Sequence, residues 1–228
     1  IKNDKEDGIR LNIDKMIQNI TESSDLNNII KTSNDYIKTN ESINGIYRYT
    51  NLDDKNIFFS RNIERLVQNY RSSFLQIAIE LISSQSQYDQ ANEVLSLMEN
   101  YFPVDVIHIN HPDVEIQIGS FFAEMGNIDL FHKYMLHASN RTDLNLQQSY
   151  LIGQLLLENS DDMQYAITHF HKMHMENPEI FEITLGLCQA YVRSNKNEMA
   201  IKVIKDWLIL HPNHVEAKEW LKLIESQI

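Results

Sequence analysis

The clearest pattern in the chain is a set of apolar positions that recurs with fixed spacing. A small residue is followed four and seven positions later by larger apolar residues, and twelve positions later by proline. Offsets of 0, +4 and +7 place side chains on one face of an α-helix. Each pattern therefore predicts an amphipathic helix that ends near its proline. The three sets are Ala91, Leu95, Met98 and Pro103; Ala166, Phe170, Met173 and Pro178; and Ala200, Ile204, Trp207 and Pro212.

A second apolar helix face precedes each of these patterns. Ala166 and Ala200 are 34 residues apart, and so are Pro178 and Pro212. The chain is therefore expected to repeat a helix–turn–helix unit, with each proline ending one unit and starting the next helix. The preceding faces are Leu75, Ala78, Ile79 and Ile82; Tyr150, Gly153 and Leu157; and Thr184, Leu187, Cys188 and Tyr191.

A more divergent unit lies after the first one. It carries Phe131 where a small residue is expected, it lacks a closing proline, and about six extra residues, 106–111, precede it. These departures predict irregular packing at this point. Its apolar and turn positions are Ile118, Gly119, Phe122, Gly126, Asn127, Phe131, Met135 and Ala138.

The two ends of the chain differ from the repeating part. A continuous apolar stripe from Ile63 to Leu81 predicts one long helix that begins near Ser60. Residues 1–59 are expected to be a partly helical junction, with short helices at 9–20 and 25–37 and a linker at 39–59 that is rich in Asn and Asp. Residues 213–226 are apolar on one side only and predict a capping helix.

The repeating pattern resembles the tetratricopeptide repeat, a unit of two helices whose second helix carries alanine, an aromatic residue four positions later and a closing proline. The resemblance implies an all-α helical solenoid that occupies residues 60–228. Its expected repeats lie near 72–105, 112–146, 147–180 and 181–214, followed by the cap at 213–226.

The same resemblance implies a concave groove lined by the first helix of each repeat. The residues at groove positions are polar, with some acids and a few apolar side chains. They lack the paired Lys and Asn with which some family members hold a partner's terminal carboxylate. The expected binding residues are Ser73, Gln76, Glu80, Ser83, Asp113, Gln117, Ser120, Gln148, Leu151, Leu155, Glu182, Gln189 and Arg193.

Composition narrows the class of partner. Apolar residues make up 43% of the chain, which is enough for a core, and the formal net charge is −12. Nucleic acids and anionic membranes are bound through clustered Lys and Arg, so this charge disfavours both. No apolar run is long enough to span a membrane. A neutral or basic partner fits this charge better, and the repeat resemblance implies that the partner is a protein or peptide.

Reactive residues are few. Cys188 is the only cysteine and lies in an apolar run, which predicts a buried thiol. Among the nine histidines, His169, His171 and His174 cluster on one expected helix, where they are expected at the surface. Only His171 and His174 could share a metal ion there, and zinc needs further ligands. The sequence also carries no familiar catalytic motif, so no catalytic residue, cofactor or metal is expected.

A second resemblance covers about sixty residues, from Ile46 to Pro103. The segment is similar to the tail of large bacterial multi-pass membrane proteins related to protein O-mannosyltransferases. The matching positions are Tyr47, Arg48, residues 51–56, Arg61, Arg65, Asn69, Tyr70, Arg71, Phe74, Ala78 and the helix from Ala91 to Pro103. The catalytic acids of that family lie in membrane loops that this sequence does not contain.

The second resemblance implies a specific biological setting. The chain would be the extracytoplasmic, periplasmic C-terminal region of a membrane glycosyltransferase, and it would bind or position the acceptor, or act in assembly. The alternative is a free-standing adaptor, which could be cytoplasmic, that binds a protein partner. In both cases the chain itself is expected to be a scaffold without catalytic activity.

Overall fold

The computed structural model describes residues 51–85 and 87–226. Residues 1–50 lie outside this description, and so do the helices expected at 9–20 and 25–37. The described residues form nine α-helices and no β-strand, which confirms the expected all-α class. They fall into two compact units that divide between His108 and Ile109.

The first unit contains two described helices, α4 (Arg61–Gln85) and α5 (Tyr88–Tyr101), which pack against each other. Helix α4 begins next to Ser60, where the apolar stripe predicts its start. Its buried side chains include Val67, Phe74 and Leu81, which lie on that stripe.

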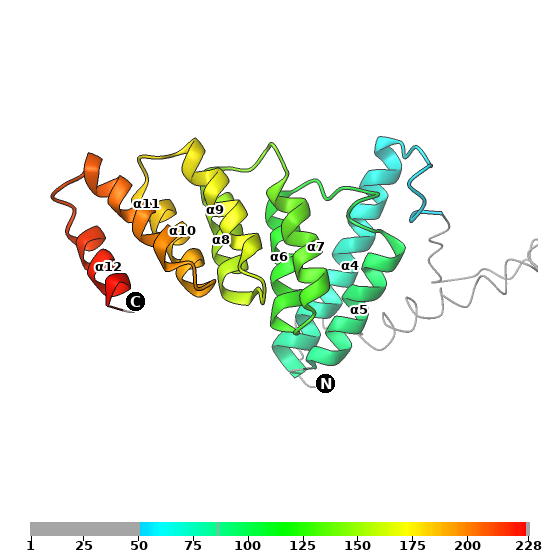
Figure 1. Cartoon of the computed structure of the whole chain (residues 1–228). Helices are drawn as coiled ribbons and strands as arrows, with labels where there is room; N and C mark the ends of the chain where they lie inside the picture. The colour runs from blue at the N-terminus through cyan, green and yellow to red at the C-terminus, as the bar shows by residue number, and fades with distance from the viewer. Residues whose placement is uncertain (1–50, 86, 227–228) are drawn as a thin grey trace, which may run out of the picture. The chain divides into compact units, whose positions relative to one another are not determined.

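The second unit is a row of helical hairpins followed by one more helix (Figure 1). In each hairpin the two helices pack together, and helices of successive hairpins also touch, as α6 touches α8 and α8 touches α10. This contact pattern is that of a helical repeat. The helices are α6 (Pro112–Glu124), α7 (Ile128–Ser139), α8 (Leu146–Asn159), α9 (Gln164–Glu176), α10 (Phe181–Arg193), α11 (Asn197–Leu210) and α12 (Val215–Glu225).

The apolar positions that recur in the sequence form the cores of both units. All nine apolar residues of the three patterns are buried, and they lie on α5, α9 and α11. Burying one large apolar side chain contributes roughly 1.5 to 3 kcal/mol, so these positions supply much of the driving force for folding. The helical spacing of the sequence thus marks the residues that hold the hairpins together.

None of the three pattern prolines starts a helix as the sequence suggests, and Pro103 directly follows Phe102, the C-cap residue of α5. Pro178 and Pro212 lie in turns, and the next helices begin at Phe181 and Val215. Each of these prolines directly follows the C-cap residue of a helix, where it prevents the helix from continuing. Only Pro112 occupies the first turn of a helix, α6.

The divergent hairpin α6–α7 achieves close packing in a different way from its neighbours. Phe131 is fully buried although a small residue is expected there. The close approach of the two helices occurs instead at Gly119, where an added Cβ would lie 2.3 Å from Cε of Met135. Gly126, with φ of +74°, provides the turn between α6 and α7.

A single aromatic ring joins two hairpins of the second unit. Phe170 of α9 is fully buried and lies against the backbone of both α8 and α10. A Cβ at Gly153 would be 2.7 Å from Cζ of this ring, and a Cβ at Gly186 would be 2.4 Å from Cε1. Both glycines are therefore required by the ring that packs between them.

We expect Gly186→Ala to lower the free energy of unfolding by about 1 to 3 kcal/mol, because the new methyl group overlaps the fully buried ring of Phe170 and must displace it. The stability lost through this steric overlap should exceed the gain of about 1 kcal/mol that alanine, in place of glycine, brings to a helix interior. Urea denaturation of the variant measures the difference. The cost should shrink in a Phe170→Leu background, and an equal cost in both backgrounds would contradict this account.

Candidate interaction face

The expected binding residues of the second unit lie on its first helices, and none of them is buried. On each of these helices they follow one face at helical spacing. Because α8 packs against both α6 and α10, the three stripes belong to neighbouring helices. We call this surface the first-helix face. It consists of Asp113, Gln117 and Ser120 on α6; Gln148, Leu151 and Leu155 on α8; and Glu182, Gln189 and Arg193 on α10.

Side-chain hydrogen bonds connect the helices along this face. Nε2 of Gln148 donates to Oδ1 of Asp113 over 2.7 Å, which joins α8 to α6. Nη1 of Arg193 donates to the carbonyl oxygen of Leu157, which joins α10 to α8. Gln148 also completes a capping box with Asn145 at the start of α8, so its position is fixed by the helix as well.

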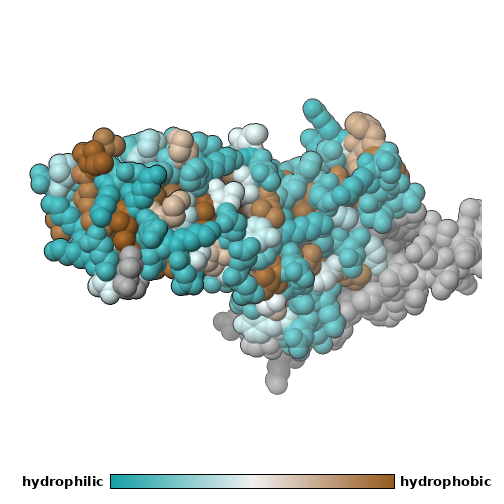
Figure 2. Space-filling model, in the orientation of Figure 1, coloured by the Kyte–Doolittle hydropathy of each residue, from teal (hydrophilic) through white to brown (hydrophobic). Residues whose placement is uncertain are grey.

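The face is hollowed at the C-terminal end of its helices. A pocket of about 360 Å³ is lined by Leu157, Glu158, Gln189, Val192, Arg193 and Trp220. We call it the α8–α10–α12 pocket. Gln189 and Arg193 are among the expected binding residues, whereas Trp220 comes from the expected capping helix. Hydrophilic residues predominate on the surface seen in Figure 2, where apolar side chains appear in separate small groups.

The remaining expected binding residues belong to the first unit and lie along α4. Gln76 and Ser83 are exposed, and Ser73 and Glu80 are half-buried. The hydroxyl of Ser73 donates to the carbonyl oxygen of Asn69 within the same helix. These four residues follow one face of α4, as the sequence suggests.

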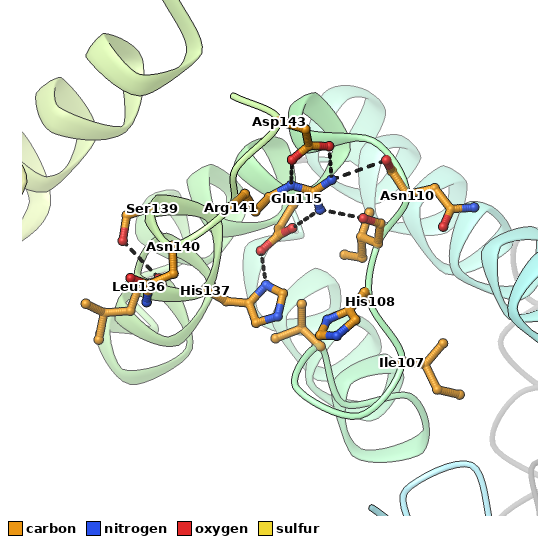
Figure 3. A network of polar contacts seen from close by, with 12 residues as sticks. Ile107, His108, Asn110, Glu115, Leu136, His137, Ser139, Asn140, Arg141 and Asp143 are labelled. Carbon is orange, nitrogen blue, oxygen red and sulfur yellow. Dashed lines mark hydrogen bonds and ion pairs between the residues drawn. The ribbon is translucent and has the colours of Figure 1, made fainter. Parts of the chain in front are cut away.

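A buried ionic network supports the start of the first-helix face (Figure 3). The carboxylate of Glu115 on α6 is completely buried, and it accepts a hydrogen bond from Nη1 of Arg141 over 2.9 Å. Nδ1 of His137 lies 2.5 Å from its other oxygen. The guanidinium of Arg141 also pairs with Asp143 through two hydrogen bonds.

Arg141 also binds the backbone before α6. Its Nη1 donates to the carbonyl oxygen of Ile109 over 2.6 Å, and its Nη2 lies 3.3 Å from that of Asn110. One side chain from the α7–α8 connection thus fixes the entry to α6. The pKa of Arg141 is raised by its hydrogen bond to Asp143 and by Glu115, so the cation is well stabilised.

Helical spacing does not reveal this network, although the sequence carries one sign of it. Glu115 lies three and seven positions before Ile118 and Phe122, so it shares the apolar stripe of α6. A carboxylate on a buried stripe needs a partner, because an unpaired charge cannot be buried at an acceptable cost. The position of the partner in the following loop is a tertiary feature that spacing does not reveal.

A comparable arginine lies in the first unit. Arg71 of α4 is buried and donates to the carbonyl oxygens of Phe102 and Ile107 over 2.7 and 2.5 Å. Its Nη1 lies 3.3 Å from the carbonyl oxygen of His108. Within each unit an arginine therefore binds the backbone of its own part of the segment 106–111.

The histidine cluster on α9 differs from the surface cluster that the sequence suggests. His169 is buried, and its Nε2 donates to the carbonyl oxygen of Ser149 over 2.7 Å. His171 is exposed, whereas His174 is half-buried with Nδ1 3.1 Å from Oγ1 of Thr184. His169 is internal because α9 packs against α8 on this side. Within the described residues no group of three or more His, Cys, Asp or Glu side chains could hold a metal ion.

Burial changes the titration of several groups in the second unit. It lowers the pKa of His169, and it also lowers the pKa values of His132 and His174. The thiol of Cys188 is buried, as expected, and burial raises its pKa to about 12. A thiol in this state is a poor nucleophile.

A second hollow, of about 470 Å³, lies between the α7–α8 connection and the end of α9. Its charged groups include Arg141 and Lys172. Arg141 is engaged by Glu115 and Asp143, and Lys172 Nζ lies 3.5 Å from the carbonyl oxygen of Ser139. These contacts give the two cations of this hollow a structural role, so the first-helix face is the stronger candidate for a binding surface.

Comparison with protein-family models, with curated proteins and with solved structures finds no match for this chain. In the part of the chain that the structure describes, every helix is too short or too polar to cross a membrane.

We expect Glu115→Gln to lower the free energy of unfolding by about 3 kcal/mol, because it leaves the buried end of Arg141 without a counter-charge. Denaturant unfolding measures this change. The matched control is Asp143→Asn, which removes the exposed carboxylate on the same guanidinium and should have a much smaller effect. Equal effects of the two variants would show that burial of Glu115 does not determine the energy of the network.

The buried His169 should make stability depend on pH. Because burial lowers its pKa below the ordinary value of 6.5, the unfolded chain binds a proton more readily than the folded chain. Stability should therefore decrease as pH falls from about 6.5 towards the lower pKa of the folded state.

Urea denaturation at pH 7.5 and at pH 5.5 tests this dependence. His169→Gln should lose less stability than the wild type between the two pH values. His171→Gln, which changes an exposed histidine of the same helix, should behave as the wild type does. A wild-type pH dependence in His169→Gln would contradict this account.

Proposed function

We propose that the chain is a non-catalytic protein-interaction module and that its first-helix face binds an extended segment of a partner protein. The observation that supports this proposal is the alignment of α6, α8 and α10, which present exposed side chains on adjacent helices. An extended segment crossing these helices would meet Gln and Ser groups for its main chain and apolar side chains such as Leu151 for its own apolar residues.

The distribution of polar groups favours binding over catalysis. Catalytic groups usually converge in one concave site where burial and neighbouring charges shift their pKa values. The polar residues of the first-helix face are instead spread along three helices. The histidines and the cysteine with shifted pKa values lie at other positions. This arrangement suits a long, shallow contact with a polypeptide.

We further propose that the hairpins are tetratricopeptide repeats. Support comes from the recurring pattern itself: its small residue and its two larger apolar residues are buried on the second helix of the hairpins α4–α5, α8–α9 and α10–α11. In that family the first helices form the binding surface, which agrees with the face proposed here.

The biological setting is a narrower proposal that rests on the likeness of residues 46–103 to the tails of bacterial membrane proteins related to protein O-mannosyltransferases. In that setting the module lies on the extracytoplasmic side of the membrane and binds or positions an acceptor. A free-standing adaptor that binds a protein partner is the alternative. The coding sequence upstream of Ile1 distinguishes the two: several hydrophobic spans support the first, and a soluble domain or a start codon contradicts it.

The interaction itself can be tested with two matched leucines. Leu151 lies on the first-helix face with 44% of its surface exposed, and Leu136 lies on the second helix α7 with 40% exposed. A partner is first identified by placing a photo-crosslinking residue at Gln117 in the natural full-length protein. Its affinity is then measured with purified components by calorimetry.

We expect Leu151→Asp to weaken binding about tenfold or more, which corresponds to at least about 1.4 kcal/mol, because it places a charge in an apolar contact. Leu136→Asp should leave the affinity unchanged. If Leu136→Asp weakens binding as much as Leu151→Asp does, or if only Leu136→Asp weakens it, the first-helix face is not the binding surface.

A further inference from the structure

The α8–α10–α12 pocket combines an apolar wall with two opposite charges. Trp220 is half-buried, and it lines the pocket together with Leu157 and Val192. Glu158 is exposed at the same pocket and presents a carboxylate. Arg193 is held there by its hydrogen bond to the carbonyl oxygen of Leu157. The pocket can therefore receive an apolar side chain whose neighbours are polar or charged.

The helices that form the first-helix face differ in charge from the rest of the second unit. Helices α6, α8 and α10 contain one cation, Arg193. Each lysine of the second unit lies on α7, α9, α11, α12 or the turn before α11. The exposed acids of the three helices are Asp113, Glu124, Glu158 and Glu182.

This segregation of charge favours a basic partner. The negative potential of a surface with four carboxylates and one guanidinium attracts Lys and Arg side chains and repels acidic ones. Burial raises the pKa of Tyr150 on α8, and the negative charge of Glu182 on the neighbouring α10 adds to this rise. Apolar burial in the pocket would add affinity that charge alone does not provide.

We propose that the α8–α10–α12 pocket holds an apolar side chain of an extended polypeptide segment, that a Lys or Arg next to this anchor pairs with Glu158, and that a Lys or Arg further along the segment pairs with Glu182, which lies at the other end of α10. The anchor packs against Trp220, Leu157 and Val192. The free N–H groups of Arg193 donate to main-chain carbonyl oxygens of the bound segment. This inference rests on the proposed binding function and specifies the chemistry of the partner.

Selection of peptides from a random display library at physiological ionic strength tests the inference. Under these conditions exposed charges more than about 8 Å apart are largely screened, so the selection reports charges that lie close to each other. Peptides that bind the wild-type protein should be enriched in Lys or Arg next to a large apolar residue. A selected peptide should bind about tenfold more weakly to Glu158→Gln with Glu182→Gln, as measured by fluorescence anisotropy.

The control is a second double variant, Glu198→Gln with Asp206→Asn, which removes the same charge from exposed positions of α11. It should bind the selected peptides as the wild type does. Trp220→Ala should weaken binding while leaving the preference for basic residues, and far-ultraviolet circular dichroism confirms that it remains helical.

Three results would overturn the inference. The selected peptides could show no basic enrichment, the two double variants could weaken binding equally, or the library could yield no binder. The first two results leave the proposed function intact, because the effect of Leu151→Asp on an identified partner measures that function separately. Basic enrichment combined with unchanged binding to Trp220→Ala would overturn the assignment of the pocket.

Discussion

The position of the first helices depends on a charge that is buried away from water. The carboxylate of Glu115 is stable inside the second unit because Arg141 and His137 contact it. Arg141 in turn binds the carbonyl oxygens of Ile109 and Asn110, which precede α6. Because Arg141 itself lies in the connection from α7 to α8, its contacts with Glu115 and with these carbonyl oxygens fix the start of α6 relative to the loop that leads into α8. The face formed by α6, α8 and α10 depends on this registration.

Buried ion pairs are rarely a source of large net stability, since the cost of removing both charges from water offsets most of their attraction. Their value here is geometric. Apolar contacts between helices tolerate small sliding motions, whereas the fork of an arginine side chain fits only one arrangement of its acceptors. In the first unit Arg71 has a similar relation to the backbone at Phe102 and Ile107. Irregular segments in both units are thus held by guanidinium groups in place of regular secondary structure.

The sequence predicts the helical content well because helix packing follows local spacing. The positions of Ala166, Phe170 and Met173 repeat at Ala200, Ile204 and Trp207, and all six are buried. The features that it misses depend on residues distant in the chain. The interior position of His169 requires Ser149 of α8 as its acceptor, and the close approach of α6 and α7 occurs at Gly119, against Met135, instead of at position 131. The sequence suggests that Pro178 and Pro212 start the next helices, but these helices begin three residues later, at Phe181 and Val215. The prediction is wrong because proline suits a turn after a helix cap as well as the first turn of a helix.

The first-helix face also combines features that follow from local spacing with features that depend on residues distant in the chain. Its residues are exposed on neighbouring helices as the repeat pattern suggests, because period and exposure are linked along a helix. The sequence does not indicate the pocket at the end of this face, since Trp220 reaches it from α12 and only the folded arrangement of α8, α10 and α12 brings these side chains together.

The ring of Phe170 has a consequence for the way in which the second unit unfolds. Repeat proteins can lose their units from an end, because each unit contacts only its nearest neighbours. Here one side chain fills space against the backbones of α8 and α10 at once. Detaching the last hairpin would leave that ring partly uncovered and would expose the surface of α10 at Gly186. The hairpins α8–α9 and α10–α11 therefore constitute one cooperative block, and the part of the first-helix face that they carry forms or disappears as a whole.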